Sequence, residues 1–473
     1  MLFNSLQFFL FFIIVYSLYL ALSHRWQNRM LLVASYLFYG AWSWKFLFLI
    51  LTSTLLDYNC GLKIYKTQDR GRKKLFLFFS ICGNLTILGF FKYYNFFAHN
   101  LQSLLSYFGF SFQPLFLNII LPVGISFYTF QTMSYTIDVF RGELQPARNF
   151  FDYALYVSFF PQLLAGPIER ATLLLPQILS PRKVSLEKFS AGCYLIFWGL
   201  FQNMFIADNL ARIVDPVFTS TSPSSGVNVL MAVFAFAFQI LCDFAGYSNI
   251  ARGLGKCLGF DIIINFNLPY FSTSLTEFWR RYHISMSSWF RDYVYTPLVI
   301  NKRDWGVGGV LYALFISFVV IGLWHGAEWK FVLFGLLQGV VISGELLTRK
   351  ARKKLSKRLP AWSTTILGIA FTFGFFSCSC LFFRAQSVPG ALFMIRDLVG
   401  NFSRDAASFG MLKDSLFYIW PLIAVQCLQY RKNDLLAVLT LPAWMRGIIY
   451  FAMYYLLVAY GVEGGKEFIY FQF

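Results

Sequence analysis

The chain has 473 residues, of which 58% are hydrophobic, 21% aromatic and only 13% charged, and its mean hydropathy is +0.58. Because soluble domains carry about 25% charged residues, this composition excludes an ordinary water-soluble fold and indicates an all-α, polytopic integral membrane protein. The formal net charge of +18 comes from basic residues in short segments between apolar runs, a pattern typical of membrane topology and lipid headgroup contacts, so we expect no nucleic-acid partner.

Apolar stretches long enough to span or half-span a bilayer recur along the whole sequence. They lie near residues 1–22, 30–56, 75–98, 115–138, 150–166, 188–212, 228–260, 308–325, 329–347, 361–383, 415–430 and 443–461. Some contain Pro or polar residues and some pairs can be re-entrant, so we expect roughly 10–13 crossings. All belong to one membrane-embedded domain covering residues 1–473. The first run has no basic leader and no small-residue cleavage pattern, which predicts a retained span.

Charge placement predicts the orientation of the chain. Lys and Arg cluster at residues 63–74 and 349–358, whereas residues 99–118 and 215–228 contain neither. The basic segments should therefore be cytoplasmic and the other two should face outward. The run at 329–347 leads into the second basic segment and rises roughly 28 Å as a helix, so His325, just before it, should start from the outer half of the membrane.

Cysteine and histidine spacing gives no sign of a disulfide framework or a metal site. Most of the eight cysteines lie inside apolar runs, where a free thiol behaves as a small hydrophobe. The four histidines are widely scattered, so no metal-ligand pattern appears and we expect no metal.

Residues 274–293, SLTEFWRRYHISMSSWFRDY, are too charged to cross a bilayer unaided but have helical periodicity. Ser274 and Glu277 form a capping-box pattern, and the aromatic residues share an arc of about 120° with the arginines opposite. His283 lies about 20° beyond the apolar arc. On periodicity alone, this is an amphipathic helix along an interface or cavity, with His283 as a border residue.

The turn at residues 322–329, GLWHGAEW, places His325 between two apolar runs. An ionisable group at membrane depth is costly and usually faces a cavity or a partner. His325 can be a structural cap of a tight turn, but a neutral imidazole in a low-dielectric cavity can also accept a proton from a hydroxyl nucleophile. We favour the second interpretation.

Other polar groups inside apolar runs are expected to be structural pairs by default, with arginines among the candidate partners. They are Asp57, Asp138 and the cluster Asp243, Tyr247, Ser248 and Asn249. No Ser has an elbow-like GxSxG setting, so a Ser/His/Asp nucleophile is not expected.

Four stretches resemble the membrane-bound O-acyltransferase family, in particular its bacterial branch of alginate O-acetylation membrane proteins. They are FFPQLLAGPIER at 159–170, CDFAGYSNIARGLG at 242–255, FWRRYHISMSSWFRDYVYTPL at 278–298 and GLWHGAEWKFVLFG at 322–335, and the terminal FIYFQF at 468–473 is also similar. The resemblance implies a helical ring around a central cavity, His325 as general base, and His283 as a group that positions or polarises the thioester. It further implies donor or substrate contacts from Trp324, Trp279, Arg280, Arg281, Arg291, Asp243 and Asn249.

The resemblance also implies a reaction and its partners. No cofactor is expected, and the donor substrate would be acetyl-coenzyme A or another acyl thioester. The acetyl group would cross a bacterial inner membrane to a polysaccharide, with an extracytoplasmic partner of the SGNH serine-hydrolase type. D-alanyl transfer to teichoic acid, a transporter or flippase without acyl chemistry, and a scaffold for an outer enzyme remain the alternatives.

Overall fold

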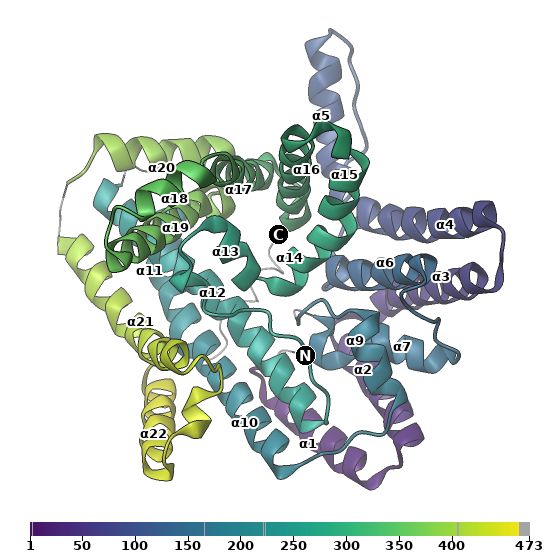
Figure 1. Cartoon of the computed structure of the whole chain (residues 1–473). Coiled ribbons are helices and arrows are strands. Elements are labelled where there is room, and N and C mark those ends of the chain that lie inside the picture. Colours follow the sequence, from purple (N-terminus) through teal and green to yellow (C-terminus); the bar gives the residue numbers. More distant parts are fainter. Residues whose placement is uncertain (2, 165, 221, 223, 404–405, 463–473) are drawn as a thin grey trace. The chain divides into compact units, whose positions relative to one another are not determined.

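The computed structural model describes residues 1–462 apart from 2, 165, 221, 223 and 404–405, and the terminal FIYFQF at 468–473 lies outside that part. Every regular element among the described residues is helical, and Figure 1 shows their course along the chain. This confirms the all-α prediction. The residues cluster into two compact units, Met1–Ile196 with Ile250–Ile263, and Phe197–Asn249 with Ile264–Phe473. The single domain covering 1–473 stays a prediction.

The first unit contains α1 (Leu6–Ala21), α2 (His24–Ser43), α3 (Leu47–Lys66), α4 (Arg70–Leu88), α5 (Tyr94–Tyr107), α6 (Ile125–Arg141), α7 (Phe150–Ser158), α8 (Phe160–Leu163) and α9 (Ala171–Leu179). Two short segments join these helices, the 3₁₀ turn η1 (Trp44–Phe46) and the π-helical η2 (Gly89–Tyr93). Two further helices have residues in both units, α10 (Leu186–Leu200) and α12 (Gly226–Cys257).

The second unit contains α11 (Asp208–Thr219), α13 (Leu275–Arg281), α14 (Ile284–Phe290), α15 (Thr296–Asn301), α16 (Val307–His325), α17 (Trp329–Leu347), α18 (Arg349–Ser356), α19 (Ala361–Arg384), α20 (Val388–Gly400), α21 (Ala406–Lys432) and α22 (Ala443–Tyr460). Its short segments are the π-helical η3 (Phe201–Ala207) and η5 (Arg291–Tyr295), and the 3₁₀ turns η4 (Pro269–Phe271), η6 (Arg303–Trp305) and η7 (Ala437–Thr440).

Nine helical stretches among the described residues are long and apolar enough to cross a membrane. They are His24–Lys66, Arg70–Tyr107, Leu186–Thr219, Gly226–Cys257, Val307–His325, Trp329–Leu347, Ala361–Arg384, Ala407–Lys432 and Ala443–Tyr460, with Leu6–Ala21 as a shorter apolar helix. The chain is therefore a multi-pass membrane protein. The predicted stretch 115–138 is helical only from Ile125, and Gly124 immediately before α6 adopts a left-handed conformation (φ 78°).

Helices α16 and α17 form a tight antiparallel pair around the turn that contains His325. Glycines permit their close approach: a Cβ on Gly322 would lie 2.3 Å from the Phe331 carbonyl oxygen, and one on Gly335 would lie 2.1 Å from the Phe318 carbonyl oxygen. Small residues at such a contact are the usual means of packing helices in membranes. The pair therefore fixes where the His325 turn sits at the end of α16.

The amphipathic segment 274–293 is not one continuous helix, so that prediction is wrong. The helix breaks after Arg281, and His283 lies in the left-handed region at φ 47° and ψ 53°. Asn265 explains the break, since its backbone oxygen accepts from the Ile284 N–H (2.9 Å) and its side-chain Oδ1 accepts from the Ser285 N–H (3.1 Å). In a continuous helix these two N–H groups would donate to carbonyl oxygens of the preceding turn. Here they donate to Asn265.

The predicted start of this segment is confirmed. The Ser274 hydroxyl accepts from the Glu277 N–H at 3.1 Å and caps α13. The Glu277 carboxylate reaches back to Thr273, accepting from its N–H (2.9 Å) and its hydroxyl (3.0 Å), one residue earlier than an ideal capping box requires.

Candidate functional site

His325 is the last residue of α16 and is only 3% exposed. Its ring is surrounded by aromatic rings, with centroids 5.0 Å from Trp324, 5.2 Å from Phe383 and 6.1 Å from Phe334. Phe334 comes from α17 and Phe383 from α19, so three helices enclose the imidazole. The turn at 322–329 thus buries an ionisable ring in apolar surroundings.

His283 and His325 lie close together, because both rings lie next to the Trp324 ring. The Trp324 ring centroid lies 5.7 Å from His283 and 5.0 Å from His325. Burial lowers the pKa of the His283 imidazole well below its usual value, and the nearby His325 lowers it further. The two histidines, 42 residues apart in the sequence, therefore belong to one site in the second unit.

Asn265 orients the fully buried His283 ring. His283 Nδ1 lies 3.3 Å from Asn265 Oδ1, which also accepts from the Ser285 N–H and hydroxyl. Asn265 Nδ2 in turn donates to the Ser248 hydroxyl at 3.2 Å. Because this side chain presents its oxygen to His283, the neutral ring carries its proton on Nδ1 and offers Nε2 as an acceptor.

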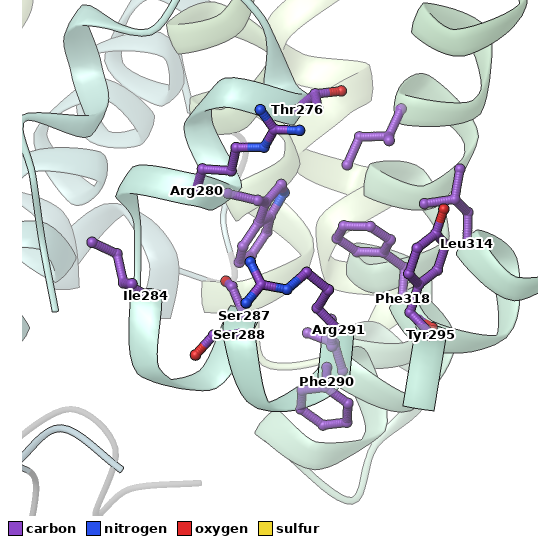
Figure 2. A pocket seen from close by; sticks show the side chains of 14 residues that line it. Thr276, Arg280, Ile284, Ser287, Ser288, Phe290, Arg291, Tyr295, Leu314 and Phe318 are labelled. Atoms are coloured by element: carbon purple, nitrogen blue, oxygen red, sulfur yellow. The ribbon is translucent and has the colours of Figure 1, made fainter. Parts of the chain in front are cut away.

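A cavity of about 260 Å³ lies along α13, α14, α16 and α17. Figure 2 shows the guanidinium group of Arg291 beside Ser287 and that of Arg280 near Thr276, whereas Leu314, Phe318 and Tyr295 lie together on the other side. The pocket therefore offers positive charge and hydroxyls on one wall and apolar surface on the other. Such a combination suits a ligand with an anionic part and an apolar part.

The pocket lies close to the histidine pair. Phe290 lines the pocket and its ring centroid lies 6.4 Å from Trp324. Ile321, another lining residue, lies one helical turn before His325 on α16. The pocket thus adjoins residues next to Trp324 and His325, although neither histidine is among the residues that line it.

The predicted donor contacts divide into two groups. Trp279, Arg280 and Arg291 line the pocket, and Trp324 lies between the histidines. Arg281 pairs with Glu277 at 2.9 Å, and Arg291 also pairs, with Asp292 at 2.9 Å, so an ion pair does not separate the two arginines. Asp243 accepts from Asn203 at 2.7 Å and Asn249 donates to Gln202 at 2.8 Å, so both contact η3, and neither they nor Arg281 are among the residues that line the pocket.

Three polar residues around the site were not found from the sequence. Asn265 holds His283, while Gln338 and Glu345 contact α13 from α17. The available signal was weak: an Asn in the apolar stretch IIINFN, and a Gln and a Glu seven residues apart in an apolar helix. Nothing in local periodicity says which distant segment such residues contact.

Comparison with known proteins gives a consistent picture. The family model described as "MBOAT, membrane-bound O-acyltransferase family" matches residues 81–387, which include both histidines and every residue that lines the pocket. The chain is 38% identical over 400 residues to the probable alginate O-acetylase AlgI of Pseudomonas putida, covering 84% of this chain and 81% of that protein.

More distant relatives carry out related acyl transfers. A peptidoglycan O-acetyltransferase of Helicobacter pylori is 32% identical over 430 residues, with 83% of this chain and 80% of that protein covered. A teichoic acid D-alanyltransferase of Bacillus subtilis is 29% identical over 269 residues, with 54% of this chain and 67% of that protein covered. These matches and the helical membrane fold agree: the chain belongs to the membrane-bound O-acyltransferase family and is an O-acyltransferase.

Proposed function

We propose that the protein moves an acetyl group from cytoplasmic acetyl-coenzyme A across the inner membrane of a bacterium, for O-acetylation of an extracytoplasmic polysaccharide. The observation that carries this proposal is the pair His283 and His325 around Trp324, beside a pocket with two arginines. The relatives named for alginate and peptidoglycan O-acetylation support acetyl as the acyl group and a polysaccharide as the acceptor.

The donor would lie in the pocket. Arg280 and Arg291 are exposed and can contact phosphate groups, while the apolar wall takes the pantetheine arm. Ile342, which lines the pocket, precedes the basic segment at 349–358 by only two turns, whereas His325 precedes the opposite end of α17. This order supports entry of the donor from the cytoplasmic side, with the thioester directed toward the histidines.

In the proposed reaction, His325 accepts the proton of the acceptor hydroxyl as its oxygen attacks the thioester carbonyl carbon. The C–S bond breaks, an ester forms, and the imidazolium returns its proton to the leaving thiolate, so the products are an O-acetyl ester and a free thiol. Because a thioester is an activated ester, orientation of its carbonyl and one base can suffice for this step without a metal. His283, with its proton on Nδ1, would position a donor N–H or a hydroxyl through Nε2.

The acceptor at the outer face can be the polysaccharide itself or a partner enzyme. We propose the latter, an extracytoplasmic enzyme of the SGNH serine-hydrolase type that passes the acetyl group to the polymer. D-alanyl transfer from a carrier protein to teichoic acid is the competing assignment, and the shorter coverage of the D-alanyltransferase relative argues against it.

The test is turnover by the purified protein in proteoliposomes given labelled acetyl-coenzyme A and an acceptor with its partner enzyme. His325→Gln should lower the rate by roughly 10²–10⁴-fold, the usual contribution of a general base. His99→Gln, at an exposed histidine of α5, is the matched control and should retain the wild-type rate.

Wild-type activity in His325→Gln would contradict the assigned base. Turnover of a D-alanyl carrier but not of acetyl-coenzyme A would replace the donor, and solute flux without any covalent acetyl product would replace acyl transfer as the function.

A further inference from the structure

Helix α17 buries three polar side chains, Lys330 at its start and Gln338 and Glu345 farther along. Gln338 is fully buried and Glu345 is 8% exposed, although the helix is otherwise largely apolar. Seven residues are almost two full helical turns, so both side chains leave the same face of α17. A buried carboxylate and a buried amide in a membrane helix are costly unless each has specific partners.

Glu345 holds the beginning of α13. Its Oε1 accepts from the Leu275 N–H at 2.8 Å, and its Oε2 accepts from the Thr276 N–H at 3.0 Å and the Thr276 hydroxyl at 2.7 Å. The first N–H groups of a helix have no acceptor within the helix, and a carboxylate there forms charge-assisted hydrogen bonds. One side chain of α17 thus fixes the backbone of the first turn of α13.

Gln338 holds the same short helix four residues farther along. Its Oε1 accepts from the Trp279 indole N–H at 3.3 Å, and its Nε2 donates to the Ser379 hydroxyl at 2.8 Å. Ser379 gives its own proton to the Phe376 carbonyl oxygen at 2.6 Å, so it can only accept from Gln338. This fixes the amide orientation, with its oxygen directed at Trp279.

These contacts link the pocket to the histidine turn. Thr276, Trp279 and Arg280 of α13 form part of the pocket wall, and α17 begins only four residues after His325. Gln338 and Glu345 are not among the residues that line the pocket. Their contacts with α13 are therefore a route by which they can act on a ligand.

We propose that Gln338 and Glu345 are positioning residues, which hold the α13 wall of the donor pocket in register with His325. The inference rests on the proposed function, because it treats the pocket as the donor site. It predicts that losing either side chain weakens donor binding specifically, whereas a purely structural role would lower stability and leave the donor KM unchanged.

The first test does not depend on acyl transfer. Hydrogen–deuterium exchange of Glu345→Gln should show faster exchange in peptides that cover residues 274–281, because an amide in place of the carboxylate removes one acceptor and places N–H groups against N–H groups. Peptides from α22 should exchange as in the wild type. Unchanged exchange at 274–281 would overturn the inference whatever the enzyme's activity.

The second test is kinetic. Gln338→Met has nearly the same volume and removes both hydrogen bonds, so the donor KM should rise roughly three- to tenfold, with smaller changes in kcat and in the acceptor KM. Gln131→Met is the matched control: Gln131 is a buried glutamine of α6 that donates to the Tyr156 carbonyl oxygen at 2.6 Å. It should lower the melting temperature without changing the donor KM.

A double-mutant cycle separates action through Trp279 from a general loosening of the unit. In a Trp279→Phe background the indole N–H is already gone, so Gln338→Met should add little to the donor KM. Two outcomes would overturn the inference and leave the proposed function intact. One is that the effects of Gln338→Met and Trp279→Phe on the donor KM are fully additive. The other is that Gln338→Met leaves the donor KM unchanged while the wild type turns over the thioester. A wild type without thioester turnover would contradict the proposed function, and the exchange experiment would still decide the role of Glu345.

Discussion

Asp57 on α3 and His325 on α16 are both buried ionisable side chains in apolar helices, but their surroundings differ. Asp57 Oδ1 accepts from the Ser80 hydroxyl at 2.5 Å and Oδ2 accepts from Asn84 Nδ2 at 2.7 Å, while the Ser80 and Thr136 hydroxyl oxygens are 2.8 Å apart. Helices α3, α4 and α6, which carry these residues, pack against one another (Figure 1). The carboxylate is thus fully engaged by neutral neighbours.

His325 lies instead among aromatic rings, with a second histidine and a pocket of about 260 Å³ beside it. The free-energy cost of burying an ionisable side chain therefore does not by itself show that the side chain takes part in a reaction. What distinguishes the two regions is access: Asp57 is closed off by hydrogen-bonded side chains, whereas the histidine pair adjoins space that a ligand can fill.

The largest effect in this comparison is expected for Asp57→Ala. Removing the carboxylate leaves the Ser80 and Asn84 donors without their acceptor, so the free energy of unfolding should fall by about 1–3 kcal/mol. The melting temperature of the purified protein in detergent measures this. Activity per folded molecule should persist, in contrast to His325→Gln.

The control for that variant is Asp304→Ala, at an exposed carboxylate with only a 3.8 Å ion pair to Arg303, which should change stability very little. If Asp57→Ala folded normally but lost its activity, the division between a structural and a chemical cluster would be wrong.

A smaller effect is expected from the pocket arginines. Arg280→Gln and Arg291→Gln should each raise the donor KM roughly two- to fivefold, a modest factor because both side chains are exposed and screened by water and salt. Kinetics at low and high salt would show the effect shrinking as salt rises.

Arg281→Gln is a matched control, since Arg281 pairs with a nearby carboxylate as Arg291 does but does not line the pocket. Equal effects of all three substitutions would mean that general surface charge, and not this pocket, attracts the donor.

The smallest effect should be a pH dependence of stability from His283. Its pKa in the folded protein is depressed by burial and by His325, below the unfolded value of about 6.5. Below that unfolded pKa the unfolded chain binds a proton that the folded site excludes, so the contribution of His283 to stability is present above about pH 6.5 and is lost as the pH falls. Melting temperatures between about pH 7.5 and pH 5.5 should decline more steeply in the wild type than in His283→Asn.

A wild-type slope in His283→Asn would show that another group controls the acid sensitivity.

Much of the fold could be predicted from the sequence because most apolar runs of span length correspond to helices. The turn at 322–329 is one case, since the sequence places His325 between two runs and α16 ends at that residue. The break at His283 could not be predicted, because helical periodicity continues through it and the cause is Asn265, 18 residues away in sequence. Asp57 was expected to be a structural pair, which agrees with its bonds to Ser80 and Asn84, although the partners are neutral side chains and not an arginine.

The roles inferred for Gln338 and Glu345 depend on tertiary contacts in the same way. Their partners lie 59 and 70 residues away, and a lone polar residue in an apolar run does not identify its partner. Charge alone does not distinguish the three arginines of segment 274–293. The positions of their side chains do, because Arg280 and Arg291 line the pocket and Arg281 does not.

The left-handed backbone at His283 also limits how this position can vary over evolution. Few residues other than glycine tolerate such a conformation, and Asn and His are among those that adopt it most readily. In the genetic code a single base change converts a His codon into an Asn codon. A lineage could therefore exchange the imidazole for an amide in one mutational step without rebuilding the loop, whereas a β-branched residue would strain the backbone as well as remove the ring.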